Sequence, residues 1–259
     1  MKALPFIKMH GLGNDYVYID CFQKATEQVI AKTELPVLAR HVSDRHFGIG
    51  SDGLVLIMPS EQADAKMRIF NADGSEAEMC GNAIRCVAKY LYESRSDQKT
   101  SLEIETLAGI RSLSLEVSNG VVREVTVNMG VPQIEKDIFL SHTCPHAYFK
   151  VNMGNPHAVF LCDSLPRLPE NTNVEFVRVR NAKELDVRVI ERGSGETMAC
   201  GTGACASAVA AITQGLTERT VTVHLPGGEL KIRWDADLAS VFMTGPATEV
   251  FRGELKFDI

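Results

Sequence analysis

Two of the seven cysteines in the sequence lie in closely similar surroundings, at positions 80 and 200. Cys80 stands in NADGSEAEMCGNAIRCVAKYL, and Cys200 stands in ERGSGETMACGTGACASAVAAI. In both segments a stretch rich in glycine and glutamate leads into Cys-Gly, and an apolar segment with helical spacing follows. This pattern predicts a thiol at a helix N-terminus, where open backbone N–H groups and the helix macrodipole favour the thiolate.

A matched pair of thiols suits inversion at a carbon next to a carboxylate. One thiolate would remove the α-proton, and the opposite thiol would deliver a proton to the other face. The backbone N–H groups after each cysteine would hold the carboxylate and stabilise the charge that develops on it. These groups belong to Gly81, Asn82, Gly201 and Thr202. The scheme requires no pyridoxal cofactor, and we expect no cofactor and no metal.

Three other roles are open to the cysteines. A zinc site could in principle use Cys80, Cys86, Cys200 and Cys205, but their C-x5-C and C-x4-C spacings differ from the usual C-x2-C. The odd number of cysteines argues against structural disulfides, although a Cys80–Cys200 bridge is expected on oxidation if the two face each other. The remaining cysteines fit buried structural positions: Cys21, Cys86, Cys144, Cys162 and Cys205.

The similarity between the two segments extends along the chain. Gly109 follows the first cysteine by 29 residues, and Gly228 follows the second by 28. Each of these glycines opens an alternating, strand-like run. Upstream, Gly13-Asn14 resembles Gly154-Asn155. A repeat of this length indicates a duplicated domain rather than a solenoid unit.

Strands dominate the predicted elements, and each half carries one main helix. The helices are expected from Cys80 to about Ser94 and from Cys200 to about Thr213, which indicates an α+β fold with mixed sheets. Residues 135–146 are predicted to be a connector. This division gives an N-terminal lobe at 1–134 and a C-terminal lobe at 135–259, with the last strand a candidate for pairing back on the first lobe.

Composition excludes several classes of protein. The net charge is −6 with acids and bases interspersed, which argues against a nucleic-acid surface. The sequence lacks an apolar run of the roughly 20 residues that span a bilayer, and its N-terminal apolar stretch is too short for a signal peptide. Seven cysteines without an export signal indicate a reducing compartment. We therefore expect a cytoplasmic protein that acts on a small molecule, with no membrane partner.

Five segments together resemble diaminopimelate epimerase, a cofactor-independent enzyme of bacterial lysine and peptidoglycan synthesis. They are HGLGNDYVYID, FNADGSEAEMCGNAIRCVAKYL, MGNPHAV, NVEFV and ERGSGETMACGTGACASA. The resemblance runs from about residue 6 to residue 250. It implies two similar lobes, each a sheet wrapped around a central helix, with the active site in the cleft between them. We also expect a homodimer.

The resemblance assigns roles to individual residues. Cys80 and Cys200 would be the acid/base pair, and Gly81, Asn82, Gly201 and Thr202 would hold the reacting carboxylate. The surroundings of the reacting amino group and the thiols would be Asn14, His157 and Glu191. The far amino-acid end of the substrate would be bound by Asn71, Asn155, Asn173 and Arg192. Three positions depart from the family pattern. Ala83 stands where glycine is usual, and Gly53 where some members carry glutamine. Thr172 precedes Asn173, where a glycine-valine pair is common nearby.

The leading hypothesis is epimerisation of LL-2,6-diaminopimelate to the meso form. The nearest alternative is a related cofactor-independent racemase of another amino acid, such as histidine. The predicted binding set for a second amino-carboxylate favours the epimerase. A non-catalytic thiol protein is the third possibility, and the three asparagines Asn14, Asn71 and Asn155 also fit ordinary turn positions.

Overall fold

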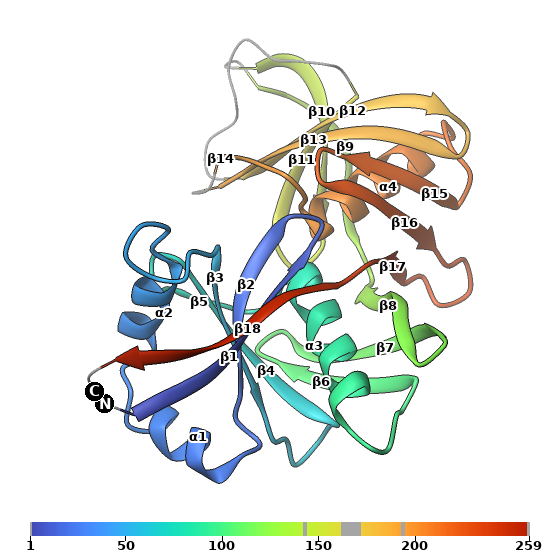
Figure 1. Ribbon diagram of the computed structural model, residues 1–259. Helices are drawn as coiled ribbons and strands as arrows, with labels where there is room; N and C mark the ends of the chain where they lie inside the picture. Colours follow the sequence, from blue (N-terminus) through green and yellow to red (C-terminus); the bar gives the residue numbers. More distant parts are fainter. Residues whose placement is uncertain (1, 142–143, 162–171, 193–194, 258–259) are drawn as a thin grey trace. The chain divides into compact units, whose positions relative to one another are not determined.

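The computed structural model describes residues 2–141, 144–161, 172–192 and 195–257. The chain forms two compact units, the first made of Met1–Val125 with Pro246–Ile259 and the second of Thr126–Gly245 (Figure 1). The lobe boundaries expected from the sequence, 1–134 and 135–259, stay a prediction.

The first unit contains a mixed sheet and three helices. Its strands pair antiparallel, except that β2 with β3 and β4 with β6 are parallel. The strands are β1 (Lys2–Gly11), β2 (Asn14–Asp20), β3 (Gly53–Met58), β4 (Ala65–Asn71), β5 (Glu76–Ala77), β6 (Ser101–Thr106), β7 (Gly109–Ser118), β18 (Thr248–Phe257) and the start of β8 (Val121–Gly130). The helices are α1 (Lys24–Ile30), α2 (Leu35–Ser43) and α3 (Gly81–Ser94).

The second unit repeats this plan, with one helix among its described residues. Here β11 with β12 and β13 with β15 are parallel, and the neighbours β9–β10, β10–β11, β12–β13, β13–β14, β15–β16 and β16–β17 pair antiparallel. Its elements are β9 (Gln133–Ser141), β10 (Cys144–Asn152), β11 (Pro156–Phe160), β12 (Asn173–Asn181), β13 (Glu184–Glu191), β14 (Gly195–Thr197), α4 (Gly201–Thr213), β15 (Thr220–Leu225), β16 (Gly228–Trp234) and β17 (Val241–Gly245).

Strand register shows the duplication residue by residue. Leu54 of β3 pairs with Phe70 of β4, and Val174 of β12 pairs with Ile190 of β13. Each residue of the second pair lies 120 positions after its counterpart, the same distance that separates the two cysteines. The predicted α+β fold of two similar units is therefore confirmed, with α3 and α4 as equivalent helices.

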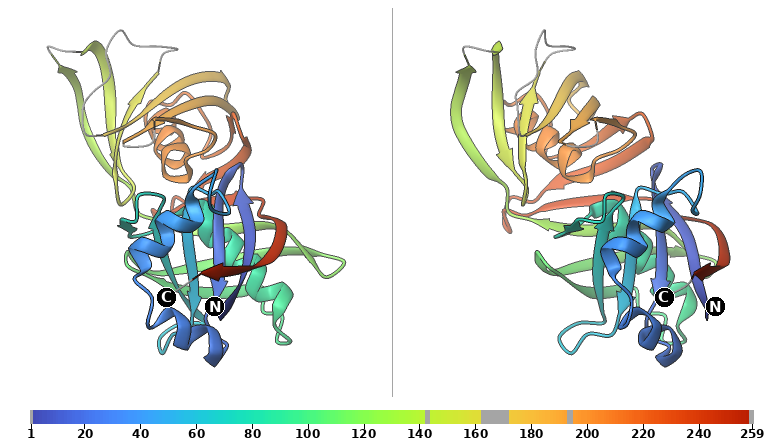
Figure 2. Two further views of the ribbon diagram at one scale, coloured as in Figure 1. Left: turned by 60° about the vertical axis from the view of Figure 1, so that its left-hand side comes forward. Right: turned by 90° about the vertical axis from the view of Figure 1, so that its left-hand side faces the viewer.

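Helix α3 packs one face against the strands of the first unit. Ile84, Val87 and Leu91 recur with helical spacing and are almost completely buried. On the other face of the sheet, α2 contributes Leu38 and Val42 to a separate core, and Figures 1 and 2 show α1 and α2 on the side away from α3. Burying each such side chain contributes about 1.5–3 kcal/mol, so packing fixes the start of α3 and with it the position of Cys80.

Helix α4 is buried on nearly all sides. It contacts β10, β11, β12, β13, β15, β16 and β17. Its alanines allow this close approach of many strands and also favour the helix. They include Ala204, Ala206, Ala208, Ala210 and Ala211, all with no exposed surface. The second unit is thus a sheet wrapped around a central helix, as the sequence predicts.

One local expectation was wrong. The described residues of the segment 135–146 belong to strands β9 and β10, which pair antiparallel, rather than to a connector without secondary structure. At the other end of the chain, β18 pairs antiparallel with β1. In Figure 2 the start of β1 therefore lies beside the end of β18. Among the described residues, none of the helices has the length and apolar character needed to cross a membrane.

Candidate active site

Cys80 is the N-cap residue of α3, with extended backbone angles of φ −138° and ψ 119°. Its side chain is half-buried, and the thiol donates a hydrogen bond to Asn14 Oδ1 at 3.5 Å. Asn14 is brought here by the tight turn between β1 and β2, where Leu12 and Gly13 both have positive φ. The predicted Cys80 and Asn14 therefore lie together, with Gly81 and Asn82 in the first turn of the helix.

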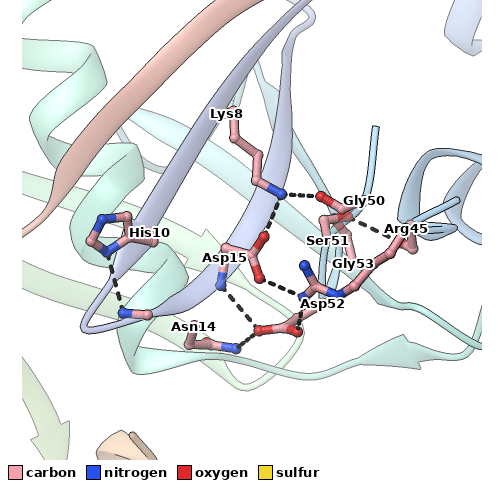
Figure 3. A network of polar contacts seen from close by, with 11 residues as sticks. Lys8, His10, Asn14, Asp15, Arg45, Gly50, Ser51, Asp52 and Gly53 are labelled. Atoms are coloured by element: carbon pink, nitrogen blue, oxygen red, sulfur yellow. Dashed lines mark hydrogen bonds and ion pairs between the residues drawn. The ribbon is translucent and has the colours of Figure 1, made fainter. Parts of the chain in front are cut away.

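The side chain of Asn14 also contacts a group of charged residues on the side away from the Cys80 thiol. Asn14 Nδ2 donates to Asp52 Oδ2 at 2.8 Å, and Arg45 Nη2 donates to carboxylate oxygens of both Asp15 and Asp52 at 2.9 Å (Figure 3). Burial acts to raise the pKa of Asp15, but hydrogen bonds from Arg45 and Lys8 outweigh it and hold that pKa below its usual value. Sequence analysis missed these charged residues, which follow turns and carry no distinctive motif.

Cys200 is the N-cap residue of α4, with φ −116° and ψ 115°. Its sulfur accepts a hydrogen bond from the Gly203 N–H at 3.4 Å and lies 3.4 Å from Thr202 Oγ1. The side chain is buried, and burial raises the pKa of the Cys200 thiol well above its ordinary value, with further increases from Glu191 and Glu175. The hydrogen bonds favour the thiolate, but they do not overcome burial and two acidic neighbours.

A buried ion pair lies beside the start of α4. His157 Nδ1 is 2.6 Å from Glu175 Oε1, and neither side chain is exposed. The other His157 ring nitrogen faces Asn155 Oδ1 at 3.0 Å. Burial raises the pKa of Glu175, while the charge and hydrogen bond of His157 act to lower it. A Cβ atom added to Gly203 would lie 2.8 Å from Glu175 Oε1, so this carboxylate contacts the first turn of the cysteine helix.

Glu175 is a further residue that sequence analysis missed. It is the one acidic residue in NVEFV, an otherwise uncharged start of a buried strand. An unpaired charge there is costly, so its presence was a usable signal. Its position equals that of Val55 in the first unit, 120 residues earlier. The two units therefore differ in charge next to their cysteine helices.

The predicted residues for the far end of the substrate occupy ordinary positions at strand ends. Asn173 Oδ1 accepts from the Arg192 backbone N–H at 2.9 Å, and the Arg192 side chain is exposed. Glu191 Oε1 accepts from Thr197 Oγ1 at 2.6 Å. Asn71 donates to Ser75 Oγ at 3.0 Å within the turn after β4, a geometry that the alternative turn role also predicts.

The predicted site residues thus form one set in each unit. Asn14, Cys80, Gly81 and Asn82 adjoin one another in the first unit, with Asn71 at the end of β4. The second unit holds Asn155, His157, Asn173, Glu191, Arg192, Cys200, Gly201 and Thr202. Among the described residues there is no group of three or more histidine, cysteine, aspartate or glutamate side chains placed to hold a metal ion.

The buried-cysteine prediction holds for the thiols that the structure describes. Cys21, Cys86 and Cys205 are buried in the cores. Burial raises the pKa of Cys21 to about 12 and that of Cys86 to about 11. The side chains of Cys144 and Cys162 lie outside the described residues.

The fold of this chain matches those of several solved structures. A PhzF-family phenazine biosynthesis protein from Bacillus anthracis matches with a TM-score of 0.75 and 17% identity, covering 99% of this chain and 100% of the other. A hydroxyproline epimerase from Agrobacterium vitis matches with a TM-score of 0.71 and 13% identity, covering 98% and 91%. At such low identity these likenesses define the fold alone, a two-unit fold that occurs in epimerases.

Sequence comparison narrows this class to one family. The family model of diaminopimelate epimerase matches residues 6–135 and 164–250. The diaminopimelate epimerase of Acetivibrio thermocellus is 48% identical, with 97% of this chain and 98% of that protein covered. That of Methanococcus maripaludis strain C5 is 46% identical over 97% and 99%. The chain therefore belongs to the diaminopimelate epimerase family.

Proposed function

We propose that the protein epimerises LL-2,6-diaminopimelate to meso-diaminopimelate without a cofactor, in the synthesis of lysine and peptidoglycan precursors. Membership of the family supports the substrate and the reaction. The mechanism is supported chiefly by one observation, that Cys80 and Cys200 cap equivalent helices of the duplicated units. We further propose that the enzyme works in the cytoplasm as a homodimer.

The reaction needs one base and one acid on opposite faces of the same α-carbon. The thiolate of one cysteine takes the α-proton, and the electron pair left on carbon is delocalised into the carboxylate. The other cysteine gives its S–H proton to the opposite face of that carbon. Atoms and charge balance, because the first cysteine ends as a thiol and the second as a thiolate. Both helix N-termini must therefore act on one substrate, and we propose that they do.

The carboxylate is proposed to bind at the backbone N–H groups that follow the two cysteines. Gly81 and Asn82 begin α3, and Gly201 and Thr202 begin α4. N–H groups in the first turn of a helix have no partner within the helix and point along its axis. Their fixed dipoles stabilise the negative charge that grows on the carboxylate during proton removal.

The acidic surroundings of Cys200 fit the positively charged α-ammonium group of the substrate. Glu191 and Glu175 both raise the pKa of this thiol. A bound α-ammonium group beside Glu191 would offset that effect, because an opposite charge within about 4–6 Å favours the ionised partner. Cys200 would then lose its proton more readily when the substrate is present than when the site is empty.

Recognition of the second amino-carboxylate is proposed for Asn71, Asn155, Asn173 and Arg192. The exposed Arg192 guanidinium offers the fork of donors that pairs with a carboxylate. A racemase of a monocarboxylate amino acid such as histidine would have no use for this set, so it is the weaker candidate.

Exchange of the α-hydrogen with deuterated water tests the proposed function. The purified protein is incubated with LL-diaminopimelate, meso-diaminopimelate and histidine, and deuterium at the α-carbon is followed by mass spectrometry. We expect incorporation and interconversion for both diaminopimelate isomers and little exchange for histidine. Rapid racemisation of histidine with untouched LL-diaminopimelate would overturn the substrate assignment.

A further inference from the structure

The amide of Asn14 has only one orientation that satisfies its neighbours. Asn14 Nδ2 lies 2.8 Å from Asp52 Oδ2. An ionised carboxylate only accepts hydrogen bonds, so the NH₂ group of Asn14 must face Asp52. Its carbonyl oxygen consequently faces the Cys80 thiol, 3.5 Å from the sulfur.

A second amide fixes the same orientation from the other side. Arg85 Nη2 donates to Asn82 Oδ1 at 3.0 Å, and Asn82 Nδ2 donates to Asn14 Oδ1 at 3.2 Å. A guanidinium only donates, so the oxygen of Asn82 must face Arg85 and its NH₂ group must face Asn14. The donors therefore all point the same way, from Arg85 through Asn82 and Asn14 to Asp52.

Both charged ends of this chain are held in place. Arg85 has no exposed surface and donates to the carbonyl oxygens of Gly81 and Pro246 at 3.1 Å. Asp52 accepts from Arg45 Nη2 at 2.9 Å and from the Asp15 backbone N–H at 3.0 Å, as Figure 3 shows. Turning Asn14 over would place acceptor against acceptor at Asp52, and turning Asn82 over would place donor against donor at Arg85.

Space around the chain is equally restricted. A Cβ atom at Gly11 would lie 2.9 Å from Arg85 Nη2 and 3.1 Å from Asn82 Cβ. The strand β1 thus approaches the two side chains so closely that only glycine fits without a shift. Packing and hydrogen bonding together define one arrangement of Arg85 and Asn82.

We infer that Asp52 and Arg85 are positioning residues, which orient the Asn14 and Asn82 amides so that Asn14 Oδ1 accepts the Cys80 S–H proton. This inference rests on the proposed function. An acceptor held against the sulfur stabilises the protonated thiol and disfavours the thiolate. Cys80 is thereby kept ready as the proton donor in the empty enzyme, and Asp52 and Arg85 act on it through the two amides.

Other ionisable groups surround Cys80 within the first unit and set the background for any test of its protonation. The sulfur is close enough to Tyr18 and Cys86 to influence their ionisation. Charged or titratable groups on neighbouring elements include Lys8, His10, Asp15, Tyr16, Arg45, Asp52, Glu78 and Arg85.

Replacing Asp52 with asparagine is the sharpest test. The Asp52 side chain is 39% exposed, so the substitution should fold. The NH₂ group of the new asparagine can face Asn14, so the Asn82 contact alone orients the Asn14 amide and the hydrogen bond from the Cys80 thiol is weakened. We expect iodoacetamide to label Cys80 roughly threefold to tenfold faster at neutral pH, the effect of about one hydrogen bond. The pH of half-maximal labelling should move down. The kcat for LL-diaminopimelate should fall by a similar factor, with little change in KM.

Asp64→Asn is the matched control. Asp64 lies in the same unit and, like Asp52, accepts hydrogen bonds from one basic side chain and one backbone N–H. Its partners are Lys99 and the Glu103 N–H, and it does not contact the amide chain. Its labelling rate and kcat should stay within about twofold of the wild type. Peptide mass mapping assigns the label to Cys80 in every case.

Two substitutions of Arg85, at the opposite end of the amide chain from Asp52, provide a second measurement. Arg85→Lys keeps a group that only donates, whereas Arg85→Gln introduces an amide that can face either way. Folded Arg85→Lys should label more like the wild type than Arg85→Gln does. Unchanged Cys80 labelling in Asp52→Asn, or an equal change in Asp64→Asn, would overturn the inference. Labelling needs no substrate, so wild-type failure to epimerise diaminopimelate would reject the proposed function separately.

Discussion

His157 Nδ1 lies 2.6 Å from Glu175 Oε1, and both side chains are completely buried. Glu175 Oε2 is also buried, and it has no hydrogen-bond partner among the described residues. The first unit has Val55 at the position of Glu175. This ion pair is therefore a specific property of the unit that carries Cys200, where a negative charge raises the pKa of the neighbouring thiol.

Removing the Glu175 carboxylate should destabilise the protein. Glu175→Ala leaves His157 buried without its partner, and we expect a loss of about 1–3 kcal/mol in the free energy of unfolding, measured in urea. Glu175→Gln keeps one hydrogen bond and should lose less. The control is Glu196→Gln, whose partner Arg188 is half exposed, and whose effect should stay within about 0.5 kcal/mol. Equal stability of Glu175→Ala and the wild type would show that the His157–Glu175 pair does not contribute to the free energy of unfolding.

Gly203 and Ala83 occupy equivalent positions, each directly after a proposed carboxylate-binding pair, and they should respond differently to substitution. Gly203→Ala places a Cβ atom 2.8 Å from Glu175 Oε1 and 3.4 Å from Cys200 Sγ, so activity and stability should both fall. Ala83→Gly in the first unit removes a methyl group from a helix, at a cost of about 1 kcal/mol. Turnover and urea unfolding of the two variants provide the comparison. A fully active Gly203→Ala variant would contradict the close contact.

Much of this architecture follows from local patterns in the sequence. The spacing of Ile84, Val87 and Leu91 after Cys-Gly predicts the helix that the structure has at Gly81–Ser94. The strand pairs around the glycine turns are predicted in the same way, because alternation and turn residues act over short distances. Segment 135–146 was misassigned because it lies between the repeated blocks and offers no such marker.

The residues that support the cysteines could not be found by pattern. Glu175 lies 18 positions from His157 in the sequence, and Asp52 lies 38 positions from Asn14. Such partners are defined by strand pairing, which no single segment encodes. A lone acidic residue in an apolar strand signals that a partner exists, but it does not identify the partner.

The raised pKa of Cys200 predicts how its reactivity changes with pH. Its thiolate fraction should be small at neutral pH and rise as the pH approaches the raised pKa, so alkylation should accelerate as the pH is raised through the alkaline range. Glu191→Gln removes one negative neighbour, lowers this pKa and should increase the labelling rate at any given pH. Cys86 and Cys21, whose pKa values of about 11 and about 12 do not depend on Glu191, serve as internal controls whose labelling should not change in this variant. Slower labelling of Cys200 in Glu191→Gln would contradict the prediction that Glu191 raises the pKa of this thiol.

Arg192→Ala should weaken substrate binding more than the chemical steps. A bidentate arginine–carboxylate contact contributes about 1.5–3 kcal/mol, so KM for LL-diaminopimelate should rise by roughly one to two powers of ten. The control is Arg188→Ala on β13, the strand that ends just before Arg192, because Arg188 pairs with Glu196 at the surface. Steady-state kinetics separate KM from kcat. If both variants show the same small change, Arg192 does not bind the second carboxylate.

The two-thiol mechanism is tested most directly by Cys80→Ala and Cys200→Ala, assayed for conversion of LL-diaminopimelate to the meso form. Each variant lacks the proton carrier on one face of the carbon, so both should lose epimerisation. Cys86→Ala, at a buried core thiol, should retain it. Exchange of the α-hydrogen without inversion is compatible with one remaining thiol. Epimerisation at a near-normal rate by either the Cys80→Ala or the Cys200→Ala enzyme would contradict the mechanism.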